Sequence, residues 1–399
     1  MKFLNGNKSK IVLTTIIIMI IGSINVLSAS FALANSTGSS SMFFLNKYIL
    51  FAAVGMVAWL LLSKLRFSTW MLIEVQITTV VVLVALLLVV HFLGITENGA
   101  RRWIGVGGFI FQPSELVKVA TITLMSAYLA PLIRQRKPAS LFSWQFCAIL
   151  VMGALVQKQP DMGTAAIIVA LGLGMLLVCG LPNWQYGLLA GISLPGIYFL
   201  TTAASYRAAR IKAWLDPWAY QADDSYQTVQ SFLAIGSGGV FGTGFGQGVS
   251  KFFYLPEAHT DFAFAVFCQE TGFIGALLLI LCFLYLCILL FNMAMQAQDA
   301  HAFLVLTGVN LLISGQVLGN IAMVTGLLPV IGVPLPFISY GGTSMLSLLC
   351  SLGLLFSALN SSSRIKMTTR SSRLNTSKQT TPSPSPTSTP PTHPWRRRK

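Results

Sequence analysis

A short polar segment before a long apolar run has the side chains best suited to chemistry. Residues 254–262 carry Glu257, His259, Thr260 and Asp261 directly ahead of an apolar stretch. The chain has only 11 acidic residues among 399, and a carboxylate at the edge of a bilayer-spanning helix is costly to place. Its position therefore marks a candidate functional site. The alternative interpretation is that Thr260 or Asp261 is the N-cap of the following helix, and the two roles can coexist.

Two adjacent arginines and an acid–base pair form a second group. Arg101 and Arg102 lie in the segment 94–114 and precede Glu115 and Lys118. Arginine matches phosphate oxygens with paired hydrogen bonds. Glu115 and Lys118 are three residues apart and share a helix face. They form either a self-neutralising pair or a pair in which Lys118 faces a partner acid or an anionic substrate.

Two further segments add polar groups. Asp161, in the short turn between two apolar runs, is either a turn former or a second carboxylate of the site. Residues 326–339 are apolar but rich in proline and lead into Ser339 and Tyr340. Such a sequence indicates irregular backbone at membrane depth, which is tolerated only where protein or a cavity covers it.

Membrane spans are the framework that holds these residues. The chain is 54% hydrophobic and 9% charged, with a mean hydropathy of +0.73, whereas soluble domains carry roughly 25% charged residues. A span needs about 20 apolar residues. The sequence predicts an all-α polytopic membrane protein with ten transmembrane helices, at about 11–33, 43–62, 70–93, 115–133, 143–157, 163–181, 184–202, 262–292, 302–325 and 340–359.

Lysines and arginines predict the orientation. If the N-terminus is cytoplasmic, the basic clusters at residues 2–10, 64–66 and 134–137 and the C-terminal tail all lie inside, as the positive-inside rule requires. Both ends are then cytoplasmic, and the largest external loop, 203–261, joins helices 7 and 8. Residues 1–34 also resemble a cleaved signal peptide, but their apolar stretch is longer than a usual signal core, which favours a retained helix.

The predicted organisation has three parts. Residues 1–42 form an N-terminal segment with the first transmembrane helix, 43–360 a membrane domain, and 361–399 a tail. The net charge of +15 is concentrated in this tail, which holds nine basic residues and no acid. Its Ser, Thr and Pro content predicts disorder. A basic tail beside a membrane is attracted to anionic lipid, so no nucleic-acid partner is expected.

Two other patterns are uninformative for chemistry. The six cysteines lie in or beside apolar spans without CxxC spacing, which is typical of small buried apolar residues. The glycine-rich stretch 236–246 lacks the Lys-Ser/Thr ending of a phosphate-binding loop.

External arginines, a lysine, carboxylates and an apolar cavity together suit a lipid that carries a pyrophosphate.

Four ordered motifs resemble one known family. They are residues 100–103 with 112–116, then 159–164, then 256–262, and then 326–329 through 341–342. Over about residues 43–360 the chain resembles the SEDS family (shape, elongation, division and sporulation) of FtsW/RodA-type proteins. The alanine in Pro-Glu-Ala-His and the sequence Phe337–Tyr340 are more similar to the division-type branch.

The resemblance implies a peptidoglycan glycosyltransferase in the bacterial cytoplasmic membrane, at the division septum. Its substrate is lipid II, a disaccharide–pentapeptide on undecaprenyl pyrophosphate. The family's essential acid corresponds to Asp261, with the role of general base for the acceptor sugar hydroxyl. Substrate contacts are expected from the remaining motif residues: Arg101, Arg102, Glu115, Lys118, Asp161, Glu257, His259, Ser339 and Tyr340.

The resemblance also implies partners. A class B penicillin-binding protein transpeptidase and other division proteins are expected. No metal motif is visible, so no metal ligands are assigned, although a divalent cation (Mg or Mn) suits the chemistry. The chain departs from the family pattern at Cys268-Gln269-Glu270, where one acid of a usual pair is missing, and at Ala263, which is smaller than usual.

Two other classes of protein fit some of these features. A transporter that flips lipid II uses the same arginines and cavity, but it is expected to carry polar residues along its spans. Here the acids gather instead at the outer face, apart from Glu74. A scaffold that only recruits a transpeptidase needs Asp261 as no more than a helix cap, which Asn replaces well.

Overall fold

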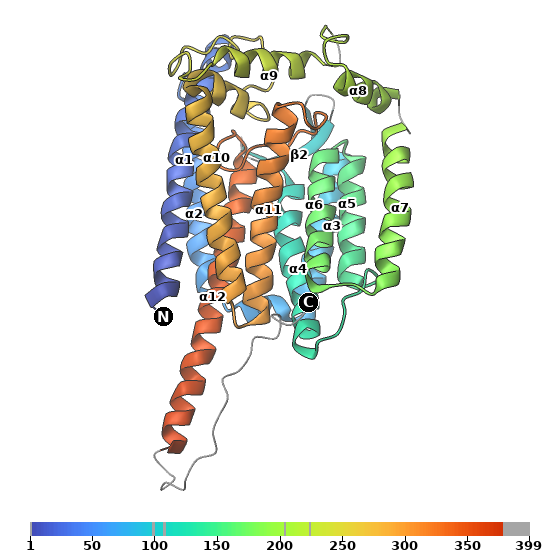
Figure 1. Ribbon diagram of the computed structural model, residues 1–399, viewed down its shortest axis with the longest axis vertical. Coiled ribbons are helices and arrows are strands. Elements are labelled where there is room, and N and C mark those ends of the chain that lie inside the picture. Colours follow the sequence, from blue (N-terminus) through green and yellow to red (C-terminus); the bar gives the residue numbers. More distant parts are fainter. Residues whose placement is uncertain (1, 98–99, 107–108, 203–204, 223–224, 378–399) are drawn as a thin grey trace.

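The computed structural model describes all residues except 1, 98–99, 107–108, 203–204, 223–224 and 378–399. It shows a bundle of long helices with several short helices and a small sheet (Figure 1). The fold is thus helical as predicted, with one small β element that the sequence did not indicate.

Each predicted span coincides with a helix in the described part of the chain. Eight helices there are long and apolar enough to cross a membrane, while the apolar helix α5 is shorter. The count of ten crossings and their orientation remain predictions. The helix bounds are α1 Lys2–Ser36, α2 Phe43–Lys64, α3 Ile73–Leu93, α4 Pro113–Gln135, α5 Trp144–Lys158, α6 Met162–Cys179, α7 Asn183–Thr202, α10 Ala263–Gln296, α11 Ala300–Val324 and α12 Gly342–Ser377, with a short 3-10 helix η1 Phe67–Met71 between α2 and α3.

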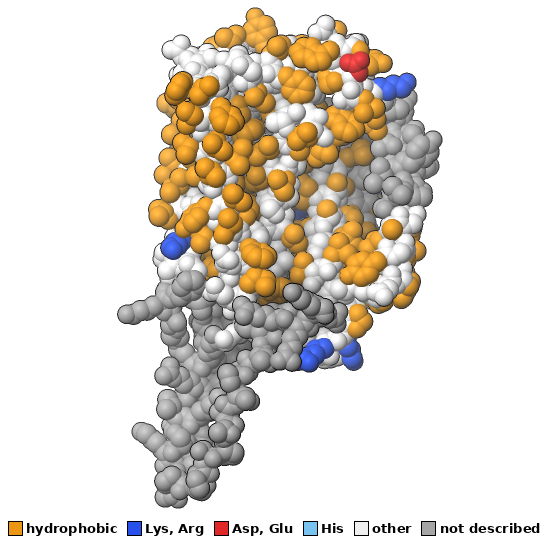
Figure 2. Space-filling model, viewed as in Figure 1, with side chains coloured by type: hydrophobic (Ala, Val, Ile, Leu, Met, Phe, Trp, Pro, Cys, Tyr) orange, Lys and Arg blue, Asp and Glu red, His pale blue; other side chains and the backbone are white. Residues whose placement is uncertain are grey.

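The two ends of the bundle differ. The start of α1 and the distal part of α12 lie at the same end of the bundle (Figure 1). This is the arrangement expected if both termini lie on the same side of the membrane. The short helices α8 (Ser205–Leu215) and α9 (Tyr226–Ser237) lie across the opposite end. In the view of Figure 2 the lateral face is mostly apolar, and most of the visible charged side chains lie toward the two ends. This distribution is the one expected of a bundle surrounded by lipid.

A three-stranded antiparallel sheet occupies the segment between α3 and α4. Its strands are β1 Ile95–Glu97, β2 Ala100–Val106 and β3 Phe109–Phe111, in the order β1-β2-β3. Arg101 pairs with Thr96, and Ile104 pairs with Phe111. The segment was predicted only as a loop, because β1 and β3 have three residues each and β2 lacks the alternation of apolar and polar residues that indicates a strand.

Helix α4 forms the centre of the bundle. Its neighbours are α3, α5, α6, α11 and α12, and most of its residues are buried. Pro113 opens α4 at a position where a missing N–H costs nothing. The site residues Glu115 and Lys118 follow in the first turns of α4 and are therefore buried from the start of the helix.

Helix α12 continues beyond its predicted end. The predicted span stops at residue 359, whereas α12 runs to Ser377, where composition favoured disorder. An existing helix adds residues at little cost, and the first proline of the tail is Pro382. The remainder of the predicted tail, 378–399, lies outside the described residues.

Helix α10 is broken at Gly272 (φ 69°, ψ −170°). The preceding loop bonds to the backbone at the break: Thr243 N–H donates to Gln269 O, and Phe273 N–H donates to Gly239 O. Only glycine adopts this conformation readily. The break therefore divides α10 into a short part, which begins next to Asp261, and a long apolar part.

We predict that Gly272→Ala destabilises the protein by about 1–3 kcal/mol. The added Cβ would overlap Gly242 N and lie 2.5 Å from Val240 O. Thermal unfolding in detergent measures the loss. Gly236→Ala in α9 is the matched control, because no atom beyond its own helix lies within 4 Å of its added Cβ. An unchanged midpoint for Gly272→Ala would contradict the strained geometry.

Candidate functional site

Asp261 lies in the turn immediately before α10 and does not cap that helix. The N-cap residue is Phe262, and no side chain makes a capping hydrogen bond there. The interpretation of Thr260 or Asp261 as a simple N-cap is therefore wrong. Asp261 is half-buried, so the residue packs against the protein and remains partly accessible.

Asn320 of α11 holds the backbone around Asp261. Its amide nitrogen donates to Asp261 O and to Val333 O, both at 2.7 Å. This places the irregular segment 326–341 against the carboxylate. The position of a Cβ on Gly332 (φ +65°) is 3.4 Å from Asp261 Oδ2. The sequence prediction of irregular backbone covered by protein is confirmed here, and Asn320 supplies part of the cover.

Asp161 is a helix cap whose carboxylate has further polar neighbours. Its Oδ1 accepts from Thr164 N–H at 3.1 Å, which caps α6. Its Oδ2 accepts from Gln112 Nε2 at 2.9 Å, and Arg102 Nη1 lies 3.9 Å from Oδ1. Asp161 is thus the N-cap of α6 and not only a turn former, and its carboxylate lies beside Arg102. Its role as a second carboxylate of the site remains a prediction.

The two adjacent arginines point in different directions. Arg102 donates to the carbonyls of Gln159 and Pro160 at the end of α5, beside Asp161. Arg101 donates to Phe92 O at 3.3 Å, at the end of α3, and is exposed. Successive residues of a strand face opposite sides, and both residues belong to β2. The structure therefore brings Arg102, and not Arg101, to the carboxylates.

Glu115 and Lys118 form a buried ion pair. Lys118 Nζ lies 2.7 Å from Glu115 Oε1, and the two side chains are 1% and 3% exposed, in the order lysine then glutamate. Ser347 Oγ of α12 donates to the other carboxylate oxygen at 2.9 Å. The self-neutralising pair is therefore present. Removing one partner of a buried pair leaves an uncompensated charge, so this pair holds α4 to α12 beneath the site.

An aromatic cluster borders Asp261 on the other side. The rings of Phe44, His259 and Tyr340 have centroid separations of 5.1–5.8 Å, and Tyr340 N–H donates to His259 O at 2.8 Å. Next to it, Thr260 Oγ1 donates to Glu257 Oε2 at 2.5 Å. The residues just before Asp261 in the chain are thus tied to Phe44 and Tyr340 by ring contacts and a backbone hydrogen bond.

Ser339 takes a structural position. Its hydroxyl oxygen accepts from Leu335 N–H at 2.9 Å, and its side chain is buried. It closes the turn that precedes Tyr340. A substrate contact from Ser339 remains a prediction from the family motif.

The carboxylates of the site hold their protons more strongly than exposed aspartates do. Burial raises the pKa of Asp261 to about 7; repulsion from Glu257 and Asp161 adds to the rise, and Arg102 opposes it. Burial also raises the pKa of Asp161, against the effect of Arg102. Burial lowers the pKa of His259, against the effect of Glu257. A carboxylate with a pKa near neutral pH can exchange a proton with a bound hydroxyl group.

Three residues near the carboxylates were not among the predicted site residues. Gln112 lies in a motif but was not chosen, since amides carry no charge. Asn320 is a polar residue inside an apolar span, which was an available signal. Phe44 is one of many aromatic residues near a helix start, and its place beside His259 follows from contacts between distant segments.

No metal centre is formed by protein side chains alone in the part of the chain that the structure describes. No group of three or more His, Cys, Asp or Glu residues there is placed to hold a metal ion. Asp161 and Asp261 provide two carboxylates, and magnesium is often bound by one or two carboxylates together with substrate phosphates. The residues therefore suit a cation that arrives with a phosphorylated substrate.

Comparisons with known proteins agree with this arrangement. The family model described as "Cell cycle protein", which covers FtsW, RodA and SpoVE, matches residues 8–364. Stage V sporulation protein E of Bacillus subtilis is 37% identical, over 86% of this chain and 94% of its own. A probable peptidoglycan glycosyltransferase FtsW of Geobacter sp. is 38% identical, over 92% and 99%.

Solved structures share the fold. One, from work titled "Structural coordination of polymerization and crosslinking by a peptidoglycan synthase complex", has a TM-score of 0.70 at 24% identity and covers 88% of this chain and 97% of its own. The rod shape determining protein RodA of Thermus thermophilus has a TM-score of 0.61 at 24% identity, over 87% and 95%. With the family match along the whole membrane domain, these similarities show that the chain belongs to the FtsW/RodA/SpoVE family of cell cycle proteins.

Proposed function

We propose that this protein is a peptidoglycan glycosyltransferase that polymerises lipid II at the outer face of the bacterial cytoplasmic membrane during cell division. The observation that carries the proposal is Asp261, a carboxylate that does not cap α10, is half-buried and has a pKa of about 7. Relatives with 36–38% identity are named as probable peptidoglycan glycosyltransferases. Glu257, Asp161 and Arg102, which affect the pKa of Asp261, all belong to the family motifs.

Asp261 acts as general base in the proposed reaction. It takes the proton of the acceptor sugar 4-hydroxyl as that oxygen attacks the anomeric carbon of the growing chain. The bond from that carbon to the pyrophosphate breaks, and the lipid pyrophosphate leaves from the opposite face. An α-linked donor then gives a β-1,4 bond with inversion. A base with a pKa near the working pH is suited to this step.

The remaining groups bind and orient the substrate. Arg102 faces the site beside Asp161 and supplies the cation for the pyrophosphate. Asp161 accepts a hydrogen bond from Gln112, which fixes the position of its carboxylate at the edge of the site. A bound Mg or Mn would neutralise charge on the pyrophosphate, and Asp161 would be its protein ligand, which leaves the Asp261 carboxylate free to act as the base. The Glu115–Lys118 pair supports the site from below by joining α4 to α12.

The proposal includes a protein partner. One structural neighbour comes from a peptidoglycan synthase complex, which supports a class B penicillin-binding protein transpeptidase beside this chain. The other division proteins and the septal location follow from the division-type motifs.

We predict that Asp261→Asn lowers lipid II polymerisation by about 10²–10⁴-fold and leaves the thermal midpoint unchanged. Asn has the same shape, and Asp261 makes no capping bond at α10 that could be lost. The assay follows labelled lipid II with the purified protein and its transpeptidase partner. Asp216→Asn, on an exposed residue, is the control. Full polymerisation by Asp261→Asn would contradict the general-base role of Asp261, whereas no polymer from either the wild type or the variant would support the transporter or the scaffold.

We predict that the polymerisation rate rises about tenfold per pH unit below pH 7 and levels off above it. The base works only when deprotonated, and its pKa is about 7. Removing the negative charge of Glu257 lowers that pKa, so Glu257→Gln moves the acidic limb to lower pH. Glu74→Gln, at an exposed position in the first turn of α3, leaves the profile unchanged. Coincident profiles for Glu257→Gln and wild type would contradict the electrostatic assignment.

We predict that Arg102→Ala lowers kcat/KM by at least about tenfold, which corresponds to roughly 1.4 kcal/mol, whereas Arg101→Ala has a much smaller effect. Arg102 lies beside Asp161, whereas Arg101 bonds to a carbonyl at the end of α3. The adjacent arginine is thus a matched control for charge. Protein abundance and thermal midpoint are measured in parallel, and equal losses for both variants would refute the distinction.

A further inference from the structure

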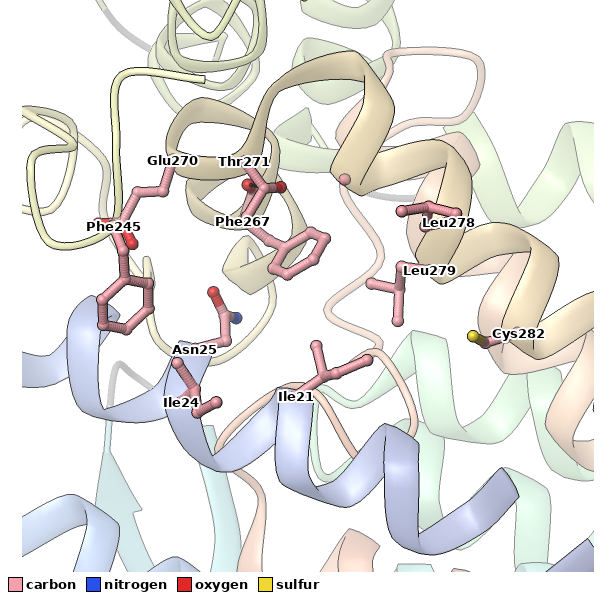
Figure 3. A pocket seen from close by; sticks show the side chains of 11 residues that line it. Ile21, Ile24, Asn25, Phe245, Phe267, Glu270, Thr271, Leu278, Leu279 and Cys282 are labelled. Carbon is pink, nitrogen blue, oxygen red and sulfur yellow. Dashed lines mark hydrogen bonds between the residues drawn. The ribbon is translucent and has the colours of Figure 1, made fainter. Parts of the chain in front are cut away.

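A cavity of about 300 Å³ separates α1 from part of α10 (Figure 3). Hydrogen bonds join the two helices at one end of it. Asn25 Nδ2 donates to Ala263 O at 3.1 Å, and Ser28 Oγ donates to Glu270 Oε1 at 2.6 Å. The cavity extends from this joint along α10, past the break at Gly272. Its apolar lining comes from α1, α10 and one loop residue: Ile21, Ile24, Phe245, Leu278, Leu279 and Cys282.

The polar end of the cavity is electrically neutral. Lys251 Nζ donates to Glu270 Oε1 at 2.7 Å, to Ser28 Oγ at 2.8 Å and to Gly246 O at 2.8 Å. All three ammonium protons therefore have acceptors within the protein. Asn25 and Glu270 line the cavity and are only 2% and 3% exposed. A charged ligand finds no unpaired counter-charge among these lining residues, so the occupant must be apolar in the part that enters.

The cavity opens onto the apolar lateral surface. Ile24 is 46% exposed and Leu278 is 58% exposed, and both line the cavity as well as the outer surface of their helices. Phe245 reaches the cavity from the loop, as Figure 3 shows. The cavity is thus continuous with an apolar surface that contacts hydrocarbon chains in a membrane.

The size of the cavity selects among apolar occupants. One turn of a helix about 10 Å wide fills on the order of 400 Å³, so a partner helix does not fit inside. A single hydrocarbon chain does. An apolar cavity does not attract water, and the contacts that its lining loses when empty are regained when a chain fills it.

We propose that this cavity binds one acyl chain of a membrane phospholipid, inserted between α1 and α10. The headgroup of the lipid stays outside the cavity, and the methylene chain lies along Ile21, Leu279 and Cys282. The bound chain fills the space that the break in α10 leaves beside α1. This assignment is independent of the proposed transferase activity.

The test uses the full chain in vesicles that contain a phospholipid with a diazirine in the middle of one acyl chain. After illumination, adducts are mapped by peptide mass spectrometry. Leu279 and Glu270 are 1% and 3% exposed, so bulk lipid does not reach them, but a chain inside the cavity does. Leu286 of α10 is 0% exposed and does not line the cavity, and it serves as the unlabelled reference.

We expect adducts on Leu279 or Glu270 several-fold above those on Leu286. Cys282→Phe fills the cavity and removes them, whereas Cys287→Phe, on the same helix but outside the cavity lining, leaves them. Thermal midpoints establish that both variants fold. If Cys282→Phe does not fold, the proposal is tested by the ratio of adduct yields at Leu279 and Leu286 in the wild type.

Two results would overturn the proposal. Labelling confined to the exposed residues Ile24 and Leu278 would show that no chain enters. Loss of the inner adducts on addition of undecaprenyl phosphate at low concentration, without loss at Ile24 and Leu278, would assign the cavity to a polyprenyl chain instead of a phospholipid.

Discussion

Non-helical backbone at membrane depth must find its hydrogen-bond partners inside the protein, because hydrocarbon supplies none. The site of this protein is built largely from such backbone. Asn320 bonds to the carbonyls of Asp261 and Val333, and so joins the turn before α10 to the segment that follows α11. The position of the carboxylate, the path of the proline-rich segment and the cover over both rest on that amide.

The same requirement explains the break in α10. The loop before α10 satisfies the interrupted backbone at Gly272: Thr243 N–H donates to Gln269 O, and Gly239 O accepts from Phe273 N–H. Lys251 neutralises Glu270 close to the same break. Chain reversal, backbone pairing and charge pairing therefore occur together at the outer end of α10. Helix α1 joins this arrangement through hydrogen bonds to α10.

Charges inside the protein fall into two kinds. The pairs Glu115–Lys118 and Lys251–Glu270 are closed, with each partner at most 3% exposed, and they connect separate segments. The carboxylates Asp161, Asp261 and Glu257 are instead grouped near Arg102, and repulsion among them adds to the effect of burial on Asp261. Mutually repelling acids beside a partly exposed cation do not form a closed, stabilising pair, and this arrangement supports the proposed proton transfer and substrate binding.

The helices were predictable because membrane spans depend on local quantities, namely length and hydropathy. All predicted spans coincide with helices, and the motifs around Asp261 lie at their ends. The choice between a helix cap and a site residue at Asp261 was not predictable, because both need the same residue type at the same place. Asp161, in contrast, caps α6 and also lies beside Arg102.

The class of fold, the family and the acid to examine could all be inferred from the amino-acid sequence, since they depend on composition and on motifs read along the chain. Three features could not be inferred from the sequence. The first is that Arg102 faces the carboxylates while Arg101 faces the end of α3. The second is that Asn320 bonds to the backbone of Asp261, and the third is the cavity between α1 and α10. Each of these depends on a direction in space, namely the alternation of a short strand, the face of a buried helix and the angle at a glycine break. Such directions arise from contacts between segments far apart in the chain.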